Sequence, residues 1–167
     1  LGEILDPAAG PLLLSLLHEA SGDARAVLLG ALRKLRHSPA LSDAVVLSED
    51  ASTDVRREAV GVLAYLKDAA AVPALLRRIT DSDPEVRRIA VGALVFATEP
   101  AVAVAVGQAL GDPDWQVRQE AASTLGKLKR DESIPALIGA LDDAAWEVRL
   151  KAANALGCLR AQGALHG

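Results

Sequence analysis

The chain is poor in the residues that β-structure and disulfide scaffolds need. Of its 167 residues only 2% are aromatic, one is a cysteine and none is a methionine. A β-sandwich draws on aromatic and β-branched residues, so this composition argues against one. With 51% hydrophobic residues and a mean hydropathy of +0.24, the chain is also too apolar to be disordered. Its 33 alanines and 27 leucines, more than a third of the chain, are typical of helices packed through small contacts.

The sequence also lacks a basic excess and a long apolar run. The net charge is −4, whereas nucleic-acid-binding domains are usually strongly basic. The longest apolar stretches, residues 12–17 and 101–106, are far shorter than the roughly 20 residues of a membrane-spanning helix. The single Cys158 allows no internal disulfide and favours a reducing compartment. We therefore expect a cytoplasmic protein that binds neither nucleic acid nor membranes.

What the chain does contain is an internal repeat with a period of 31 residues. The pair Val-Arg recurs at this spacing, starting at Val55, Val86, Val117 and Val148, and Ala24-Arg25 stands one period earlier. A leucine column keeps the same register: Leu32, Leu63, Leu94, Leu125 and Leu156. So does an acidic column: Glu19, Asp50, Asp81, Asp112 and Asp143. Several independent columns that agree on one period indicate five copies of one unit.

Each unit is predicted to form two helices. In the fourth unit Val117, Ala121, Leu125 and Leu128 follow one another at i, i+4, i+8 and i+11, which is one apolar stripe of an α-helix. Aspartate, serine and proline precede these stripes and can cap a helix start. No segment alternates with period two, so the fold class is all-α. The units span approximately residues 8–36, 39–67, 70–98, 101–129 and 132–160 of a single domain.

The repeat resembles a known family. Units such as residues 112–128, DPDWQVRQEAASTLGKL, resemble HEAT repeats, and among these the short bacterial type named after phycobilisome lyases. The resemblance covers nearly the whole chain. It implies a right-handed α-solenoid of helix pairs whose second helices line the concave side. The first helices of the second and fourth units depart from the pattern, and we expect local irregularity there.

Both ends of the chain continue the repeat. Residues 1–4 lie five periods before residues 156–159, and residues 164–165 are in register with residues 133–134. Solenoids normally end in polar capping units. We therefore expect a partial repeat at each end and a chain that is a fragment of a longer one.

An aspartate and an arginine six residues later recur in each full copy. The set is Asp50, Arg56, Asp81, Arg87, Asp112, Arg118, Asp143 and Arg149. Since a guanidinium has a fixed fork of donors, we expect a structural ladder in which each arginine bonds a nearby loop carboxylate or carbonyl. An anion-binding row of arginines is the alternative. Trp115 and Trp146 also share a column, where they either cover the joint between repeats or contact a ligand.

Positions three, seven and ten after the valine of each Val-Arg pair are expected to face away from the core. They are Glu58, Val62 and Tyr65 in the second unit, and Ile89, Ala93 and Phe96 in the third. Gly61 and Gly92 lie beside them and would leave a shallow groove. The predicted partner-binding residues of the concave face are Tyr65, Phe96, Ile89, Glu58, Glu120, Lys34 and Lys127. The alternative is that both rings belong to the core.

Catalytic and metal-binding signals are missing from the sequence. His18-Glu19 has no second histidine four residues on, as a zinc-protease motif would require. Deoxyhypusine hydroxylase, a HEAT-repeat enzyme, carries His-Glu after Val-Arg, where this chain has Arg57-Glu58 and Gln119-Glu120. We expect no catalytic residue, metal or cofactor.

The predicted function is therefore that of a non-catalytic scaffold or adaptor that binds another protein or peptide segment. Two alternatives remain. The resemblance implies a phycobilisome-lyase-like subunit that acts on a bilin-carrying protein, and the repeats could also regulate an enzyme domain of a larger chain.

Overall fold

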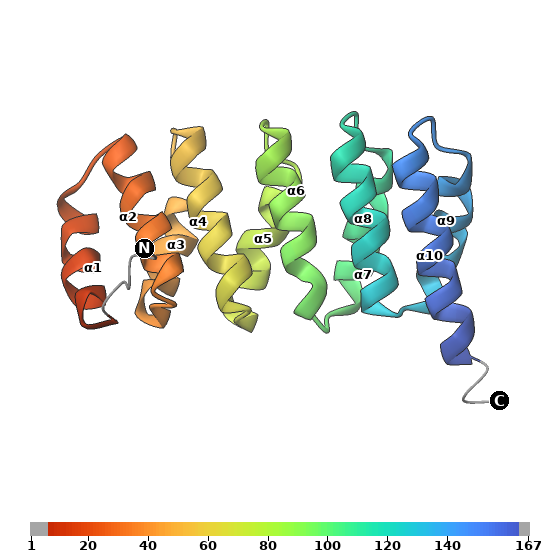
Figure 1. The fold of residues 1–167 in the computed structure, drawn as a ribbon, viewed down its shortest axis with the longest axis horizontal. Helices are drawn as coiled ribbons and strands as arrows, with labels where there is room; N and C mark the ends of the chain where they lie inside the picture. Colours follow the sequence, from red (N-terminus) through yellow and green to blue (C-terminus); the bar gives the residue numbers. More distant parts are fainter. Residues whose placement is uncertain (1–6, 164–167) are drawn as a thin grey trace, which may run out of the picture.

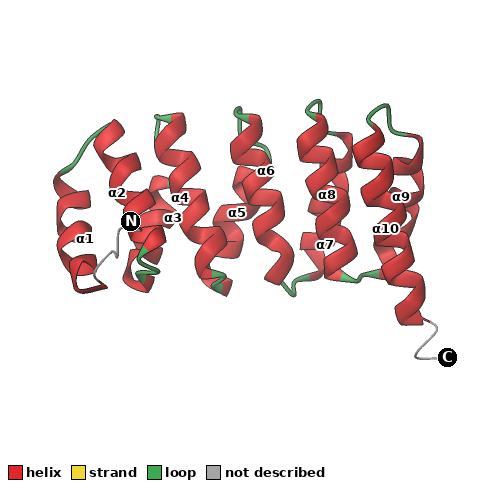
Figure 2. Cartoon of the chain, in the orientation of Figure 1, coloured by secondary structure: helices red, strands yellow, loops and turns green. Residues whose placement is uncertain are grey.

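The computed structural model describes residues 7–163, which form pairs of helices stacked side by side (Figure 1). The first helices of the pairs are α1 (Gly10–Glu19), α3 (Leu41–Leu47), α5 (Val72–Arg78), α7 (Pro100–Gln108) and α9 (Ile134–Gly139). The second helices are α2 (Asp23–Lys34), α4 (Thr53–Leu66), α6 (Pro84–Ala93), α8 (Trp115–Leu128) and α10 (Trp146–Gly163). Short 3₁₀ turns precede or follow several of them, and within the described residues no strand is present (Figure 2). The predicted all-α solenoid is confirmed.

The helices form two layers. The second helices lie side by side, each packed against the next, and α3, α5, α7 and α9 lie in a layer behind them (Figure 1). We call the outward surface of α2, α4, α6, α8 and α10 the second-helix face. The partial repeats expected at the chain ends involve residues 1–6 and 164–167, which lie outside the described residues.

The core lies between the two layers and is built from the repeat columns. Leu32, Leu63, Leu94 and Leu125 are fully buried, as are the valines of the four Val-Arg pairs. They belong to one continuous hydrophobic cluster that runs through all the repeats, while Leu156 is half-buried at its edge. Each buried leucine or valine contributes about 1.5–3 kcal/mol relative to an exposed one. The 31-residue period therefore sets how each repeat packs on its neighbours.

Local sequence explains where the second helices begin and end. Asp83 caps α6 by accepting the Val86 N–H at 3.0 Å, and Pro84 occupies the first position, where its missing N–H has no cost. Lys67 and Lys129 take left-handed backbone angles and end α4 and α8. The irregularity expected in the first helices of the second and fourth units is present only in the fourth. In the second unit α3 has seven residues and follows a 3₁₀ turn, as α5 does. In the fourth unit α7 has nine residues and begins at Pro100 with no 3₁₀ turn directly before it.

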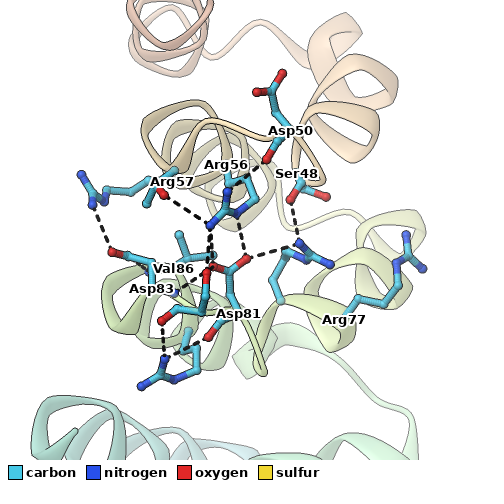
Figure 3. A network of polar contacts seen from close by, with 12 residues as sticks. Ser48, Asp50, Arg56, Arg57, Arg77, Asp81, Asp83 and Val86 are labelled. Carbon is cyan, nitrogen blue, oxygen red and sulfur yellow. Dashed lines mark hydrogen bonds and ion pairs between the residues drawn. The ribbon is translucent and has the colours of Figure 1, made fainter. Parts of the chain in front are cut away.

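An arginine–aspartate ladder connects neighbouring repeats (Figure 3). Arg56 donates through Nε and Nη2 to the two carboxylate oxygens of Asp81, both at 2.9 Å. Its Nη1 donates to the carbonyls of Asp50 and Ala51, both at 3.0 Å. The aspartate six residues before the arginine thus supplies a carbonyl, and the carboxylate comes from the next repeat, 25 residues ahead.

The same geometry recurs along the stack. Arg87 binds both oxygens of Asp112 at 2.7 and 2.8 Å. Arg118 binds Asp143 at 2.7 and 2.9 Å. The first and last arginines of the ladder make fewer hydrogen bonds. Arg25 makes one contact with Asp50, at 3.2 Å, and Arg149 donates only to the carbonyls of Asp143 and Ala144.

Each ladder carboxylate also organises its own loop. Asp81 accepts the Asp83 N–H at 3.0 Å, and Asp112 accepts the Asp114 N–H at 2.8 Å. The side chains are largely removed from water, with Arg56 11% and Asp81 3% exposed. The donors of Arg56 are occupied by protein oxygens, which favours the structural role of this row over anion binding.

The ladder shifts the protonation of its members. Burial by itself raises the pKa of Asp81, but the hydrogen bonds from Arg56 and the Asp83 backbone outweigh it and lower that pKa. Asp112 behaves in the same way, with Arg87 as its partner. For Asp143 the hydrogen bond from Arg118 is the largest cause of a lowered pKa. The three arginines have raised pKa values for the same reason.

We predict that Asp112→Ala lowers the free energy of unfolding by about 3 kcal/mol, because it leaves the buried Arg87 guanidinium without a counter-charge. Urea unfolding followed by circular dichroism measures the loss. The matched control is Glu49→Ala, which removes the exposed ion pair with Arg77 and is expected to cost less than about 1 kcal/mol. Equal losses for the two variants would contradict the ladder's role.

We also predict that acid weakens the fold through the ladder. The folded pKa values of Asp81, Asp112 and Asp143 lie below the unfolded value of 3.8, so the carboxylates contribute fully above that pH. As the pH falls through the folded pKa values the unfolded chain binds more protons, and this stability is lost. Asp112→Asn should make the slope below pH 3.8 shallower, by up to about 1.4 kcal/mol per pH unit. An unchanged slope in urea titrations at these pH values would refute this.

Candidate functional site

Two open grooves lie next to each other on the second-helix face. The first, of about 590 Å³, runs between α2 and α4. The second, of about 520 Å³, runs between α4 and α6. Arg33, Arg57 and Glu58 line both grooves. The two grooves therefore form one continuous hollow across three successive second helices.

Glycines allow long side chains to lie across the neighbouring helix. A Cβ at Gly61 would come within 3.4 Å of the Arg33 side chain, and one at Gly30 within 3.2 Å of Glu58 Oε2. Arg33 and Glu58 meet there, with Nη2 and Oε2 3.2 Å apart. The small residues of this column thus shape the floor of the hollow.

The arginines of the hollow are paired with nearby carboxylates. Arg57 contacts Asp54 at 3.0 Å and Asp83 at 3.5 Å. Arg88 contacts Glu85 at 2.6 Å and, more loosely, Glu120 at 3.9 Å. The hydrogen bond from Arg88 lowers the pKa of Glu85 and raises that of Arg88 itself. The surface therefore offers both donors and acceptors in a fixed arrangement.

Two arginines of this surface were not among the residues expected from the sequence. Arg57 and Arg88 each follow a ladder arginine directly, so Arg-Arg recurs with the 31-residue period. In each pair the first arginine turns into the ladder and the second lines the second groove. The repeated pair was the signal that could have identified them.

Tyr65 is the aromatic residue that lines the hollow. Its side chain is 40% exposed, lines the second groove and has the Arg36 guanidinium 5.5 Å from the ring centroid. This distance is within the range of a cation–π interaction, which holds the ring in place. Ile89 lines the same groove and is half-buried against the core.

Phe96 differs from Tyr65, although the two share a repeat column. It lies in the 3₁₀ turn Leu94–Phe96 that follows α6, is half-buried against the core and is not part of either groove lining. A 3₁₀ turn has three residues per turn instead of 3.6, so the last residues of this unit are rotated relative to an α-helix. The alternative that the ring belongs to the core thus applies in part to Phe96 and not to Tyr65.

Val62 and Ala93 were expected on the exposed stripe, and this expectation is wrong. Both are buried, as are Thr124 and Ala155 of the same column. The column faces the neighbouring second helix, since a Cβ at Gly126 of α8 would lie 2.8 Å from the Ala155 Cβ of α10. The helices α4, α6 and α8 are each contacted by a neighbouring second helix on both sides, so fewer of their residues are exposed than the repeat pattern predicted.

The remaining predicted residues divide between the grooves and their surroundings. Lys34 lines the first groove, and Glu58 lines both. Glu120 reaches from α8 to Arg88 at the edge of the second groove. Lys127 is exposed in the last turn of α8 and lines neither groove. The structure thus brings Lys34, Glu58, Tyr65 and Ile89 together.

The two tryptophans are partly exposed at the starts of their helices. Trp115 and Trp146 are the first residues of α8 and α10 and are 39% and 60% exposed. Within the described residues neither indole N–H has a hydrogen-bond acceptor. Both rings begin a helix whose first-turn valine, Val117 or Val148, faces the core, and two residues earlier on a helix is nearly the opposite side.

Residues 7–163 contain no group of three or more His, Cys, Asp or Glu side chains placed to hold a metal ion. None of the helices in this range combines the length and apolarity that crossing a membrane would require.

Sequence comparison gives one family match. The model for HEAT repeats matches residues 38–107 and 103–166. No curated protein matches the sequence.

Solved structures with a similar fold include natural and designed proteins. The complex of CpcE and CpcF of phycocyanin lyase from Nostoc sp. PCC7120 has a TM-score of 0.78 and 23% identity over 90% of this chain and 64% of that one. A designed armadillo repeat protein in complex with the peptide (KR)4 has a TM-score of 0.74 and 25% identity, over 91% and 82%. Human deoxyhypusine hydroxylase has a TM-score of 0.61 and 20% identity, over 94% and 64%. The chain thus spans less than two thirds of the lyase and hydroxylase chains, and likeness at this identity shows a shared fold alone.

Two glycines of the second helices, Gly126 and Gly92, differ in what an added methyl group would meet, and we predict different effects of replacing them by alanine. A methyl group at Gly126 would meet the backbone of α10, with Ala155 Cα at 2.9 Å, so Gly126→Ala should destabilise by about 1–3 kcal/mol. At Gly92 the nearest atom is the flexible end of Glu120, and Gly92→Ala should change stability by less than about 1 kcal/mol. Urea unfolding compares the two variants. A stabilised Gly126→Ala protein would show that this contact is not tight.

Proposed function

The chain belongs to the HEAT-repeat family, and we propose that it is a non-catalytic interaction scaffold that binds a segment of a partner protein on its second-helix face. The observation that carries the proposal is the continuous hollow over α2, α4 and α6, with the exposed Tyr65 ring inside it. A hollow that crosses several repeats suits an elongated ligand, such as an extended peptide or a helix.

The polar groups of the hollow suit a peptide. Arg33, Arg57 and Glu58 present guanidinium donors and carboxylate acceptors to both grooves, and backbone amides can bond to either kind. Tyr65 and Ile89 supply an apolar centre with a polar rim, which is the usual arrangement of a binding hot spot. We propose that Lys34, Glu58 and Glu120 orient the segment, and that Lys127 contacts it beyond the grooves.

Rigidity favours this use of the surface. The ladder ties each loop to the next repeat, so the relative positions of α2, α4 and α6 are set before a partner arrives. Less conformational entropy is then lost on binding. The similarity to a designed armadillo repeat protein in complex with a peptide supports the proposal.

Peptide selection tests the function directly. Peptides of twelve residues selected from a random phage library on the wild-type protein should bind Tyr65→Ala about tenfold or more weakly, since truncating a hot-spot aromatic has this effect. Isothermal titration calorimetry measures the affinities, and circular dichroism verifies that the variant is folded.

The control is Val46→Ala, which truncates a side chain that is 71% exposed on α3, in the other layer. It should leave the affinity unchanged. A library that yields no binder, or binders that are insensitive to Tyr65→Ala, would rule out the second-helix hollow as the binding site.

A phycobilisome-lyase-like subunit is the second candidate function, and the similarity to the complex of CpcE and CpcF is the observation that favours it. It would act on a bilin-carrying protein, or with one. Incubation with a free linear tetrapyrrole followed by gel filtration separates the two functions. Co-elution of pigment with a shifted visible band would favour the lyase-like role, and pigment-free protein would leave the scaffold role.

A further inference from the structure

The charged residues of the second-helix face differ between the middle repeats and the last two repeats. In the second and third repeats Arg57 and Arg88 pair with the first-turn carboxylates Asp54 and Glu85. In the fourth and fifth repeats the arginine position is taken by Gln119 and Leu150. The first-turn carboxylate itself is replaced by Gln116 in α8, whereas Glu147 of α10 keeps its charge without an arginine at this position.

Exposed apolar side chains gather on the same part of the face. Trp115 and Trp146 begin the two neighbouring helices, one repeat apart, and are 39% and 60% exposed. Leu150 follows Trp146 by one helical turn and is 49% exposed. The equivalent positions of the second and third repeats hold Thr53 and Pro84, so the indoles are particular to this end of the stack.

Carboxylates beside the indoles have free acceptor capacity. Asp114 precedes Trp115 and accepts the N–H groups of Gln116 and Val117 on one oxygen, Oδ1. Glu147 follows Trp146, and within residues 7–163 neither carboxylate forms an ion pair. The aspartate's second oxygen, Oδ2, is thus available to a ligand.

Three cations, Arg118, Arg149 and Lys151, lie in the first two turns of the same helices. Arg118 is engaged with Asp143 at 2.7 Å, and Arg149 donates to the carbonyls of Asp143 and Ala144 at 2.8 and 3.1 Å. Lys151 lies one turn after Glu147 on α10 and has no ion pair among the described residues. Both arginines therefore donate their hydrogen bonds to ladder oxygens and not to Asp114 or Glu147, although Arg118 is close enough to Asp114 for a Coulomb attraction.

We infer that Trp115, Trp146, Asp114 and Glu147 form a second binding surface, for the lysine or arginine side chains of a basic segment of a partner protein. Indole faces attract cations within about 6 Å of the ring centroid, and a nearby carboxylate adds a charge-assisted hydrogen bond. An anionic partner, such as a nucleic acid or an acidic membrane, would be repelled by the same carboxylates. Because neighbouring packed helices lie about 8–10 Å apart, the surface suits two cationic side chains with a similar separation.

Tryptophan emission provides a local probe, because Trp115 and Trp146 are the two tryptophans of the chain. The ligand is the capped peptide (Gly-Arg)4, and (Gly-Glu)4 is its charge-reversed counterpart. We expect (Gly-Arg)4 to change the emission saturably, with an affinity that weakens as sodium chloride is raised, and (Gly-Glu)4 to have no effect. Calorimetry gives the affinities independently of fluorescence.

Variants then separate the contributions of the rings and the charges. Trp146→Ala should weaken (Gly-Arg)4 binding at least tenfold, and its exposure means that the fold is retained. The double variant Asp114→Asn, Glu147→Gln keeps a helix cap at position 114 and should weaken binding about fivefold or more. Tyr65→Ala, on α4, should bind as the wild type does, which separates this surface from the peptide-binding hollow.

The proposal is overturned if (Gly-Arg)4 shows no saturable binding up to 1 mM, or if the two peptides bind equally. Wild-type affinity in either the tryptophan or the carboxylate variant would also overturn it. Loss of binding in Tyr65→Ala alone would assign the peptide to the hollow instead.

Discussion

The bidentate contact between an arginine of one repeat and an aspartate of the next is the interaction on which the rest of the structure depends. Arg56, Arg87 and Arg118 each hold the carbonyls of their own loop and the carboxylate of the following one. Apolar packing between second helices is not directional, so a layer of alanine, valine and leucine contacts tolerates sliding. The ladder fixes the position of each repeat relative to the next, because a guanidinium can donate to both oxygens of a carboxylate in few geometries.

The hollow on the second-helix face follows from this fixed register. The second helices are held side by side, and their small residues leave room for Arg33 and Glu58 to cross to the neighbouring helix. The resulting hollow is lined by paired charges and one exposed ring. Farther along the stack Gln119 and Leu150 stand in place of Arg57 and Arg88, and Trp115 and Trp146 are exposed at the helix starts. The same scaffold thus presents two chemically different surfaces, which is what repeat proteins gain from varying exposed positions on a constant core.

The fold was largely predictable, and the details of the surface were not. The columns led by Val55 and Leu63 predicted the helix pairs and their core, because burial is decided by the periodicity of apolar residues. The spacing of Asp50 and Arg56 predicted that they would act together. It did not reveal that Arg56 takes its carboxylate from Asp81, since spacing along one chain cannot show which neighbouring loop a side chain reaches.

The sequence by itself determined the architecture: a 31-residue period in which apolar, acidic and arginine columns agree admits one arrangement of stacked helix pairs. The tertiary structure alone decided which positions remain accessible. Val62 and Tyr65 lie three residues apart on one helix, yet one is buried against a neighbouring helix and the other is exposed. Phe96 turns partly into the core because α6 ends in a 3₁₀ turn. Exposure depends on the contacts between neighbouring helices and on where each helix ends, and a column in a repeat alignment contains neither.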